Sequence, residues 1–263
     1  MNIETFFGLS FTQILLGFSR ASGLMVAAPV FQSRFIPSRV KMFFAFILAI
    51  VIAPYIKSDL NLNQFTFSMA FFSLIQELLV GIIIGFMVNL PFYALQLSGY
   101  FFDISMGYGI VNILDPNTGT EMPVLGQFNY ILALLIFLTV NGHHSLIISL
   151  IQSYEEIKPG MLFLRKEAAA VFLKAFSSMF VLGFKIGAPV LGSIFLTDMA
   201  LGIIAKLIPQ INIFVIGFSV KILLGLVILM LFIPIFIHLV GAAFGNSADA
   251  FSYLRHILRA LHQ

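Results

Sequence analysis

The sequence predicts an all-α, polytopic membrane protein, and composition, the distribution of charge and the lack of strand periodicity all indicate this class. Among the 263 residues, 60% are hydrophobic and only 10% are charged, whereas charged residues make up about 25% of an ordinary soluble domain. A soluble protein of this length lacks the interior to bury so much apolar surface. Strict alternation of polar and apolar residues is absent, which argues against an outer-membrane barrel.

Three stretches without Asp, Glu, Lys or Arg are each long enough for a helical crossing, which takes about 20 apolar residues. They lie between Glu77 and Asp103, between Glu121 and Glu155, and between Lys221 and Asp249. The first apolar segment has no basic leader region, so we interpret it as a retained helix rather than a cleaved signal peptide.

Helices are expected along the first 154 residues wherever apolar runs are bounded by loop signals. The expected ranges are about Thr5–Phe31, Met42–Tyr55, Phe67–Phe102, Val124–Val140 and a shorter piece that continues to Tyr154. The range 67–102 is too long for one crossing at about 1.5 Å per residue, and Gly81, Gly85 and Pro91 offer places to break it into two. Asn141-Gly142 is a turn signal.

The second half of the chain is expected to contain two long helices. The stretch 155–167 is the most charged and is expected to be exposed. Helices are expected at about Ala168–Lys206, with a bend at Pro189, and at Phe214–Phe244, with a tight connection at Pro209-Gln210. The tail from Phe251 to Leu261 places apolar residues on one face and basic residues largely off it, which predicts a short basic amphipathic helix.

Basic residues set the expected orientation, because cytoplasmic loops carry an excess of Lys and Arg. If residues 67–102 cross once, the acidic stretch 103–123 falls inside and two of the three basic regions fall outside. If they cross twice, as a hairpin, all three basic regions fall inside. The hairpin is favoured, although each of its crossings is at the short limit. The three basic regions are Arg34/Arg39/Lys41, Lys158/Arg165/Lys166 and Arg255/Arg259.

Ionisable residues within or at the ends of the apolar helices form the first group of candidate functional residues. They are Arg20, Glu77, Lys174, Lys185, Asp198, Lys206 and Lys221. Such groups are costly at membrane depth and usually face protein or water. One interpretation is an ion or proton pathway. The favoured interpretation is that they pair with neighbouring helices or partner subunits, or extend to the membrane interface.

The stretch 103–123 is expected to be a non-helical loop, and its centre is the most unusual part of the sequence. That centre consists of Gly107, Tyr108, Gly109, Ile110, Val111, Asn112, Ile113, Leu114, Asp115 and Pro116. An apolar, glycine-flanked stretch is costly in lipid unless it is buried in protein or lines an aqueous cavity. It is either a flexible constriction that seals a pore by apolar contact or a packed turn between helices.

No pattern of catalytic or ligand-binding residues is found in the sequence. A nucleophile–His–acid set, a phosphate-binding loop and a cluster with metal-ligand spacing are all absent, and a chain without Cys has no thiolate sites. His143 and His144 are adjacent and would point about 100° apart on a helix, so a cap or turn role is expected instead of metal binding. The small net charge of +3 gives no reason to expect nucleic acid. We expect no enzymatic activity and no cofactor.

Four stretches, taken in order, cover nearly the whole chain. They are Arg20 to Pro54, with Ala28-Pro29-Val30-Phe31 and Ile36-Pro37-Ser38-Arg39; Met106-Gly107 to Asp115-Pro116, followed by Pro123-Val124-Leu125-Gly126; Phe137-Leu138-Thr139-Val140-Asn141-Gly142-His143; and Ala188-Pro189, Asp198, Ala200-Leu201-Gly202, Pro209-Gln210-Ile211-Asn212-Ile213-Phe214, Gly217-Phe218 and Lys221. Together they resemble the FliR family of flagellar export-apparatus membrane proteins, whose counterpart in virulence secretion is SctT.

The resemblance implies a core subunit of the type III export gate, located in the bacterial inner membrane and the flagellar basal body. Such a subunit assembles with FliP and FliQ subunits into a helical pore for unfolded flagellar proteins. It is joined by FlhB and is expected to meet FlhA and the basal-body ring.

The resemblance also implies long kinked helical hairpins. Residues 1–154 would form a FliP-like part with a plug loop at 104–122, and residues 155–263 a FliQ-like hairpin with the basic tail. The plug inside the pore matches Gly107–Pro116. Ile110 and Ile113 are aliphatic where relatives often carry aromatic residues.

The preferred function is therefore a non-enzymatic export-gate subunit, needed for flagellum assembly, whose loop blocks the pore at rest and yields when substrate enters. A rival from another class is an ion-coupled small-molecule membrane transporter, supported by Glu77, Lys185 and Asp198 and by broken helices. A second rival is a structural scaffold in the same complex that takes no part in gating.

Overall fold

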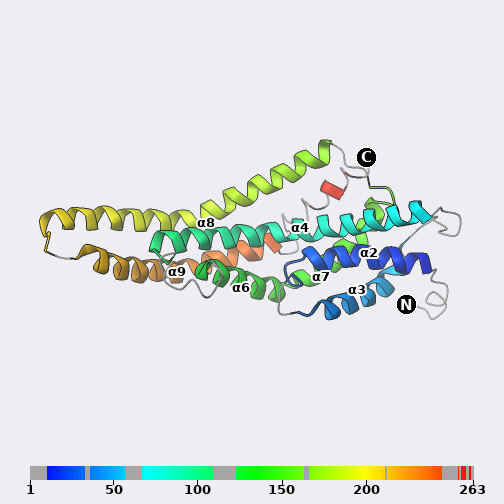
Figure 1. Ribbon diagram of the computed structural model, residues 1–263, viewed down its shortest axis with the longest axis horizontal. Coiled ribbons are helices and arrows are strands. Elements are labelled where there is room, and N and C mark those ends of the chain that lie inside the picture. The colour runs from blue at the N-terminus through cyan, green and yellow to red at the C-terminus, as the bar shows by residue number, and fades with distance from the viewer. Residues whose placement is uncertain are drawn as a thin grey trace. The chain divides into compact units, whose positions relative to one another are not determined.

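The computed structural model describes residues 11–32, 36–56, 67–108, 123–162, 166–210, 212–244, 254, 256–258 and 261. Over these residues the chain forms helices and turns without a strand, which confirms the all-α class (Figure 1). The elements are α2 (Phe11–Ala27), α3 (Ser38–Ile52), the 3₁₀ turn η1 (Ala53–Tyr55), α4 (Phe67–Met106), α6 (Val124–Thr139), α7 (Gly142–Glu156), α8 (Lys166–Leu207) and α9 (Ile213–Phe244).

Several of these helices are long and apolar enough to cross a membrane. Within the described ranges there are four, or five if the bent pair α6 and α7 counts as one span. The spans are Ser38–Tyr55, Ser68–Met106, Lys166–Leu207 and Val215–His238, and the bent pair turns by 73° at its break. The prediction of a polytopic membrane protein is therefore confirmed.

The segment expected to be a hairpin is instead one helix. Helix α4 runs for 40 residues with Pro91 inside it, about 60 Å at 1.5 Å per residue. A proline removes one backbone hydrogen bond and bends a helix, but it doesn't reverse the chain. The prediction of two crossings within 67–102 is wrong. Helix α4 also continues to Met106, so the expectation that the non-helical loop begins at Asp103 is wrong by four residues.

The predicted turn at Asn141-Gly142 is confirmed. Asn141 has φ 57°, in the left-handed region, which Asn tolerates better than most residues with a Cβ. Helix α6 ends at Thr139 and α7 begins at Gly142, so this one backbone conformation produces the break between them.

The chain divides into two compact units. Unit 1 contains Met1–Leu90, Val140–Phe176 and Phe244–Gln263, and unit 2 contains Pro91–Thr139 and Ser177–Ala243. These units draw on both halves of the sequence and run through α4 and α8. The predicted division at residue 154 into a FliP-like and a FliQ-like part concerns likeness to other subunits and not compactness. It stays a prediction.

In unit 1, glycines allow α2 and α4 to pack with their backbones almost in contact. A Cβ on Gly23 would lie 2.1 Å from the carbonyl oxygen of Leu78, and a Cβ on Gly81 would lie 2.0 Å from that of Arg20. Small residues spaced by four permit such close approach in membrane helices. Gly81, expected as a possible break in the helix, is therefore a packing position. Helices α2 and α3 also lie side by side (Figure 1).

The tail belongs to unit 1 and buries the apolar face that its sequence pattern predicts. Leu254, Ile257, Leu258 and Leu261 are buried, whereas His256 is exposed. The described positions of the tail are helical, so the predicted amphipathic helix is confirmed where the structure describes it. The stretch 155–167, expected to be exposed, has a buried part: Ile157 and Pro159 face the interior of the unit.

Unit 2 has an apolar core where parts of α4, α6, α8 and α9 meet. Its buried members are Phe102, Met106, Leu125, Val190, Ile194 and Leu229. Gly183 lets α8 approach α4, since a Cβ there would lie 2.8 Å from the carbonyl oxygen of Ala94. Helices α8 and α9 are connected through a turn at Pro209 and Gln210, as expected.

Candidate functional site

A buried ion pair joins α2 to α4 within unit 1. The Arg20 Nε donates to Glu77 Oε2 at 2.7 Å and the Arg20 Nη2 donates to Glu77 Oε1 at 3.1 Å. The two side chains are 0% and 1% exposed. The geometry is bidentate, the strongest arrangement available to an Arg–carboxylate pair.

The remaining polar atoms of this pair are also hydrogen-bonded. The Arg20 Nη1 donates to Ser153 Oγ at 2.8 Å, and Nη2 also donates to the carbonyl of Ile157 at 3.3 Å. The guanidinium carbon lies 3.7 Å from the centre of the Tyr154 ring, within cation–π distance. On the other side, the Gly160 N–H donates to Glu77 Oε1 at 3.2 Å.

These contacts tie three parts of unit 1 to one point. Helix α2 supplies Arg20, α4 supplies Glu77, and α7 with the turn after it supplies Ser153, Tyr154 and two backbone groups. Burial of both charges is tolerable only because each is paired and hydrogen-bonded. The arrangement favours pairing between helices over an ion pathway at these two residues.

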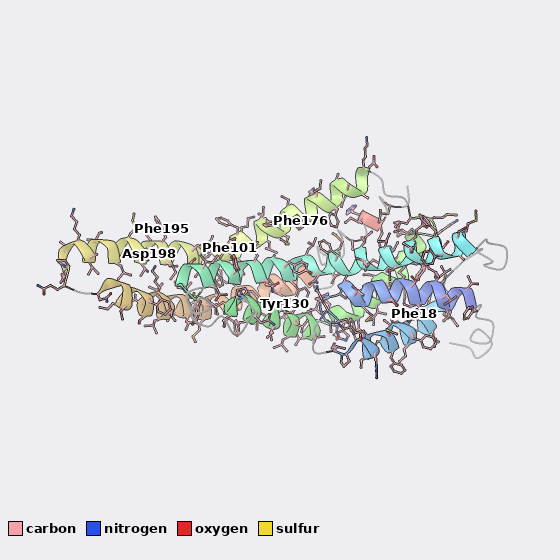
Figure 2. All side chains as sticks on the ribbon, viewed as in Figure 1. Phe18, Phe101, Tyr130, Phe176, Phe195 and Asp198 are labelled. Atoms are coloured by element: carbon pink, nitrogen blue, oxygen red, sulfur yellow. The ribbon has the colours of Figure 1, made fainter. Side chains whose placement is uncertain are left out.

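A second ion pair joins α8 to α9 within unit 2. Lys221 and Asp198 are in direct contact, with side chains 25% and 48% exposed. Figure 2 shows Asp198 and Phe195 on the same stretch of α8, and Phe195 is 62% exposed. Lys185 and Lys206, also on α8, are exposed. All four ionisable groups therefore sit on helix surfaces that carry large exposed apolar side chains.

Only the first residues of the candidate plug lie within the described part of the chain. Gly107 has φ 84°, which favours glycine, and ends α4. Its N–H donates to the Ile104 carbonyl at 3.2 Å, and the Tyr108 N–H donates to the Asp103 carbonyl at 2.9 Å. The other members of the predicted plug, from Gly109 to Pro116, lie outside the described residues.

The structure identifies Asp103 as a residue that sequence reasoning missed. Its carboxylate is 4% exposed and accepts hydrogen bonds from the backbone N–H groups of Leu125 and Gly126, at 3.1–3.4 Å. Those groups belong to the first turn of α6, which follows Pro123. The Pro123 side chain has no acceptor for the first N–H groups of α6. A proline at this position was therefore the signal in the sequence that another residue could cap the helix.

The remaining sequence motifs lie at turns. His143 is half-buried near the start of α7, with its ring centre 4.3 Å from that of the exposed His144. Pro209 and Gln210 are exposed. Among the described residues, no group of three or more His, Cys, Asp or Glu is placed to hold a metal ion.

Comparison with known proteins gives a consistent result along most of the chain. Residues 11–247 match the family described as bacterial export proteins, family 1. The chain is 37% identical to the flagellar biosynthetic protein FliR of Bacillus subtilis (strain 168) over 225 residues, which are 84% of this chain and 85% of that protein. This chain belongs to the FliR family of bacterial export proteins.

Two further FliR proteins agree with this assignment. The FliR protein of Escherichia coli (strain K12) is 31% identical over 239 residues, covering 89% of this chain and 91% of that protein. That of Pectobacterium carotovorum subsp. carotovorum is 30% identical over 247 residues, covering 92% and 94%. Both ion pairs and Asp103 lie within residues 11–247, the range that matches bacterial export proteins, family 1.

Proposed function

We propose that this chain is a core subunit of the flagellar type III export gate, needed for flagellum assembly. In this proposal it assembles with FliP and FliQ subunits into a pore for unfolded flagellar proteins, in contact with FlhB, FlhA and the basal-body ring. It would reside in the inner membrane as a multi-pass protein of the basal body. The observation that carries the proposal is membership of a bacterial export family across residues 11–247, with relatives named as flagellar biosynthetic proteins.

The surface chemistry of unit 2 supports assembly with other subunits. Helix α9 is strongly apolar, yet only 17% of its spanning segment is buried in this chain. Lys185 and Lys206 are exposed on the neighbouring apolar helix α8. Ionisable groups are costly against hydrocarbon and usually face protein or water, so this surface favours contact with partner subunits over contact with lipid alone.

Co-purification tests the assembly. The full chain, tagged and expressed with FliP, FliQ and FlhB, is extracted in mild detergent and what accompanies it is identified. FliP and FliQ should be recovered in fixed ratio, and cells lacking the chain should have no flagella. Recovery of the chain alone, with flagella intact in its absence, would contradict the proposal.

Gating is assigned to the loop whose centre is Gly107–Pro116, because a glycine-flanked apolar stretch suits a seal inside a protein-lined pore. Deletion of Gly109–Leu114 should make the assembled complex leak small ions in liposomes. Replacement of the same six residues by Gly and Ser is the matched control for loop length. It should leak less than the deletion because the backbone still fills space. A tight complex after deletion would favour the scaffold role without gating.

The ion-coupled transporter is the alternative, and it makes a different prediction. It requires accessible ionisable groups, whereas Glu77 is fully buried against Arg20. It also requires that the purified chain alone take up a small molecule in liposomes. Uptake without FliP and FliQ would replace the export-gate proposal.

A further inference from the structure

We infer that the outward face of α3 is a lipid-binding surface, and that Arg39 and Lys41 at its start hold anionic phospholipid headgroups against it. The inference goes beyond the export-gate role, because it depends only on the surface of one helix and would stand if that role failed. The whole surface belongs to unit 1.

Helix α3 uses its small residues for contact with α2. Ala45 and Ala49, followed by Ala53 in η1, recur on one face of the helix and are at most 1% exposed. On α2, a Cβ added to Gly17 would lie 3.3 Å from the Ala49 carbonyl oxygen. Small residues let helices approach closely in a membrane, so the close-packing face of α3 is already occupied by α2 of its own chain (Figure 1).

The opposite face of α3 presents only large apolar side chains. Val40, Phe43, Ile47 and Val51 lie along it and are 40–63% exposed. Residues 42–54 include no polar side chain, no charge and no glycine. Large side chains keep a second helix at a distance, whereas fluid acyl chains adapt to their shape. Phospholipid is therefore the occupant that this face fits.

The exposed surface of α8 differs from that of α3 in both charge and side-chain size. It includes Lys185 and Lys206, which are costly against hydrocarbon. It also includes Gly192, where nothing lies within 4 Å of an added Cβ, so another helix can come close. The same two properties that favour protein as the neighbour of α8 favour lipid as the neighbour of α3.

The length and the ends of α3 match a bilayer. The span Ser38–Tyr55 has 18 residues, about 27 Å at 1.5 Å per residue, close to the hydrocarbon thickness of about 30 Å. Tyr55 is 58% exposed at one end, and tyrosine is enriched at the membrane–water interface. The basic residues Arg39 and Lys41 lie at the other end, so the apolar face is bounded on both sides by interfacial side chains.

Arg39 and Lys41 supply the charge that selects anionic lipid. They flank Val40, so they stand on either side of the outward face. Arg39 is exposed and Lys41 half-buried, and neither forms an ion pair with a described residue. Cytoplasmic ends of helices carry Lys and Arg, and the cytoplasmic leaflet carries anionic lipid. A phosphate headgroup above the apolar face would meet both cations.

Quenching by brominated lipids tests the contact directly. The chain contains no Cys, so Phe43→Cys or Ile47→Cys provides the only attachment site in it for a bimane fluorophore. The full chain is placed in phosphatidylethanolamine vesicles that contain brominated phosphatidylglycerol or brominated phosphatidylethanolamine. Both lipids should quench both labels. Phosphatidylglycerol should quench the label at position 43 more strongly, since each cation should enrich anionic lipid about fivefold, the equivalent of about 1 kcal/mol.

Charge-matched variants test the headgroup assignment. Arg39→Gln/Lys41→Gln should abolish the preference for phosphatidylglycerol at position 43 and leave quenching by phosphatidylethanolamine unchanged. Lys185→Gln/Lys206→Gln removes the same charge from α8 and should keep the preference. Equal quenching by the two lipids before any charge is removed, or a preference that survives Arg39→Gln/Lys41→Gln, overturns the assignment.

Assembly separates this inference from the proposed function. In the complex with FliP and FliQ the label at position 47 should stay quenched by lipid, and its loss of quenching would show that a subunit covers α3 and overturn the inference. A label introduced by Leu196→Cys on α8, at a site 69% exposed, should lose its quenching on assembly. Retained quenching there, or failure to form a complex, contradicts the proposed assembly, while the α3 labels in vesicles of the chain alone still decide the lipid contact.

Discussion

The two ion pairs of this protein have the same chemistry but opposite surroundings. In unit 1, Arg20 and Glu77 are shielded from solvent, and the polar atoms of both side chains are hydrogen-bonded within the chain. In unit 2, Lys221 and Asp198 touch each other at the surface of two helices with large exposed apolar side chains. The first pair is completed by its own chain. The side chains of the second pair are partly exposed, and in our proposal other subunits cover them.

The difference predicts where each pair acts. Removing one partner of a buried pair leaves an unpaired charge and costs about 3–5 kcal/mol, whereas an exposed pair contributes about 0–1 kcal/mol. The Arg20–Glu77 pair should therefore determine whether unit 1 folds. The Lys221–Asp198 pair should matter little to the isolated chain and more to its assembly.

Removal of Glu77 is the strongest test of this contrast. Glu77→Leu should lower the free energy of unfolding by about 3–5 kcal/mol, because the Arg20 guanidinium stays buried without its counter-charge. The measurement is reversible denaturation of the chain in detergent. The double variant Arg20→Leu/Glu77→Leu should recover a large part of the loss. A double variant as unstable as the single one would mean that the hydrogen bonds to α7, and not the unpaired charge, dominate.

Substitution of Gly81 tests whether close helix packing is what brings Arg20 to Glu77. A Cβ there meets backbone, 2.0 Å from the Arg20 carbonyl oxygen and 2.9 Å from the Leu24 nitrogen, so no flexible side chain can yield. Gly81→Ala should cost about 1–3 kcal/mol, the usual range for overpacking. Gly192→Ala is the control, since nothing lies within 4 Å of that site, and it should be neutral or slightly stabilising. Equal losses of unfolding free energy in Gly81→Ala and Gly192→Ala would contradict a packing role for Gly81.

The sequence predicted these sites unevenly, for physical reasons. Arg20 and Glu77 were each recognised because a charge in an apolar helix is rare and costly. Their pairing, 57 positions apart, was not, because helix periodicity says which face a residue occupies but not which helix it meets. Asp103 was missed for a related reason: it was assigned to a loop, whereas it lies on α4 and caps a helix that begins at Val124.

The error in α4 has a similar origin. Gly81, Gly85 and Pro91 are typical signals of a break, and the favoured orientation relied on one. In the structure two of these glycines face α2 at backbone contact distance, so their lack of a side chain serves packing. The proline lies inside a continuous helix. Local signals predicted the Asn141-Gly142 turn and the other described helices, but they divided α4 in two. Packing between helices, which local signals do not report, decides whether a glycine breaks a helix or lets it pack closely.

Neutralising the exposed pair should give the smallest effect on the isolated chain. Asp198→Asn should change its free energy of unfolding by no more than about 1 kcal/mol, because solvent screens a pair this exposed. The double variant Asp198→Asn/Lys221→Met should change the free energy of unfolding of the isolated chain by a similarly small amount. In the proposed complex with FliP and FliQ, the same single substitution should reduce recovery of the partners, because Lys221 loses its counter-charge in a setting with less water. Denaturation of the chain alone and co-purification of the complex measure the two effects. The contrast between the two pairs would be reversed if Asp198→Asn lowered the free energy of unfolding as much as Glu77→Leu and left assembly unchanged. The exposed pair would then stabilise its own chain and contribute nothing to contacts with partners.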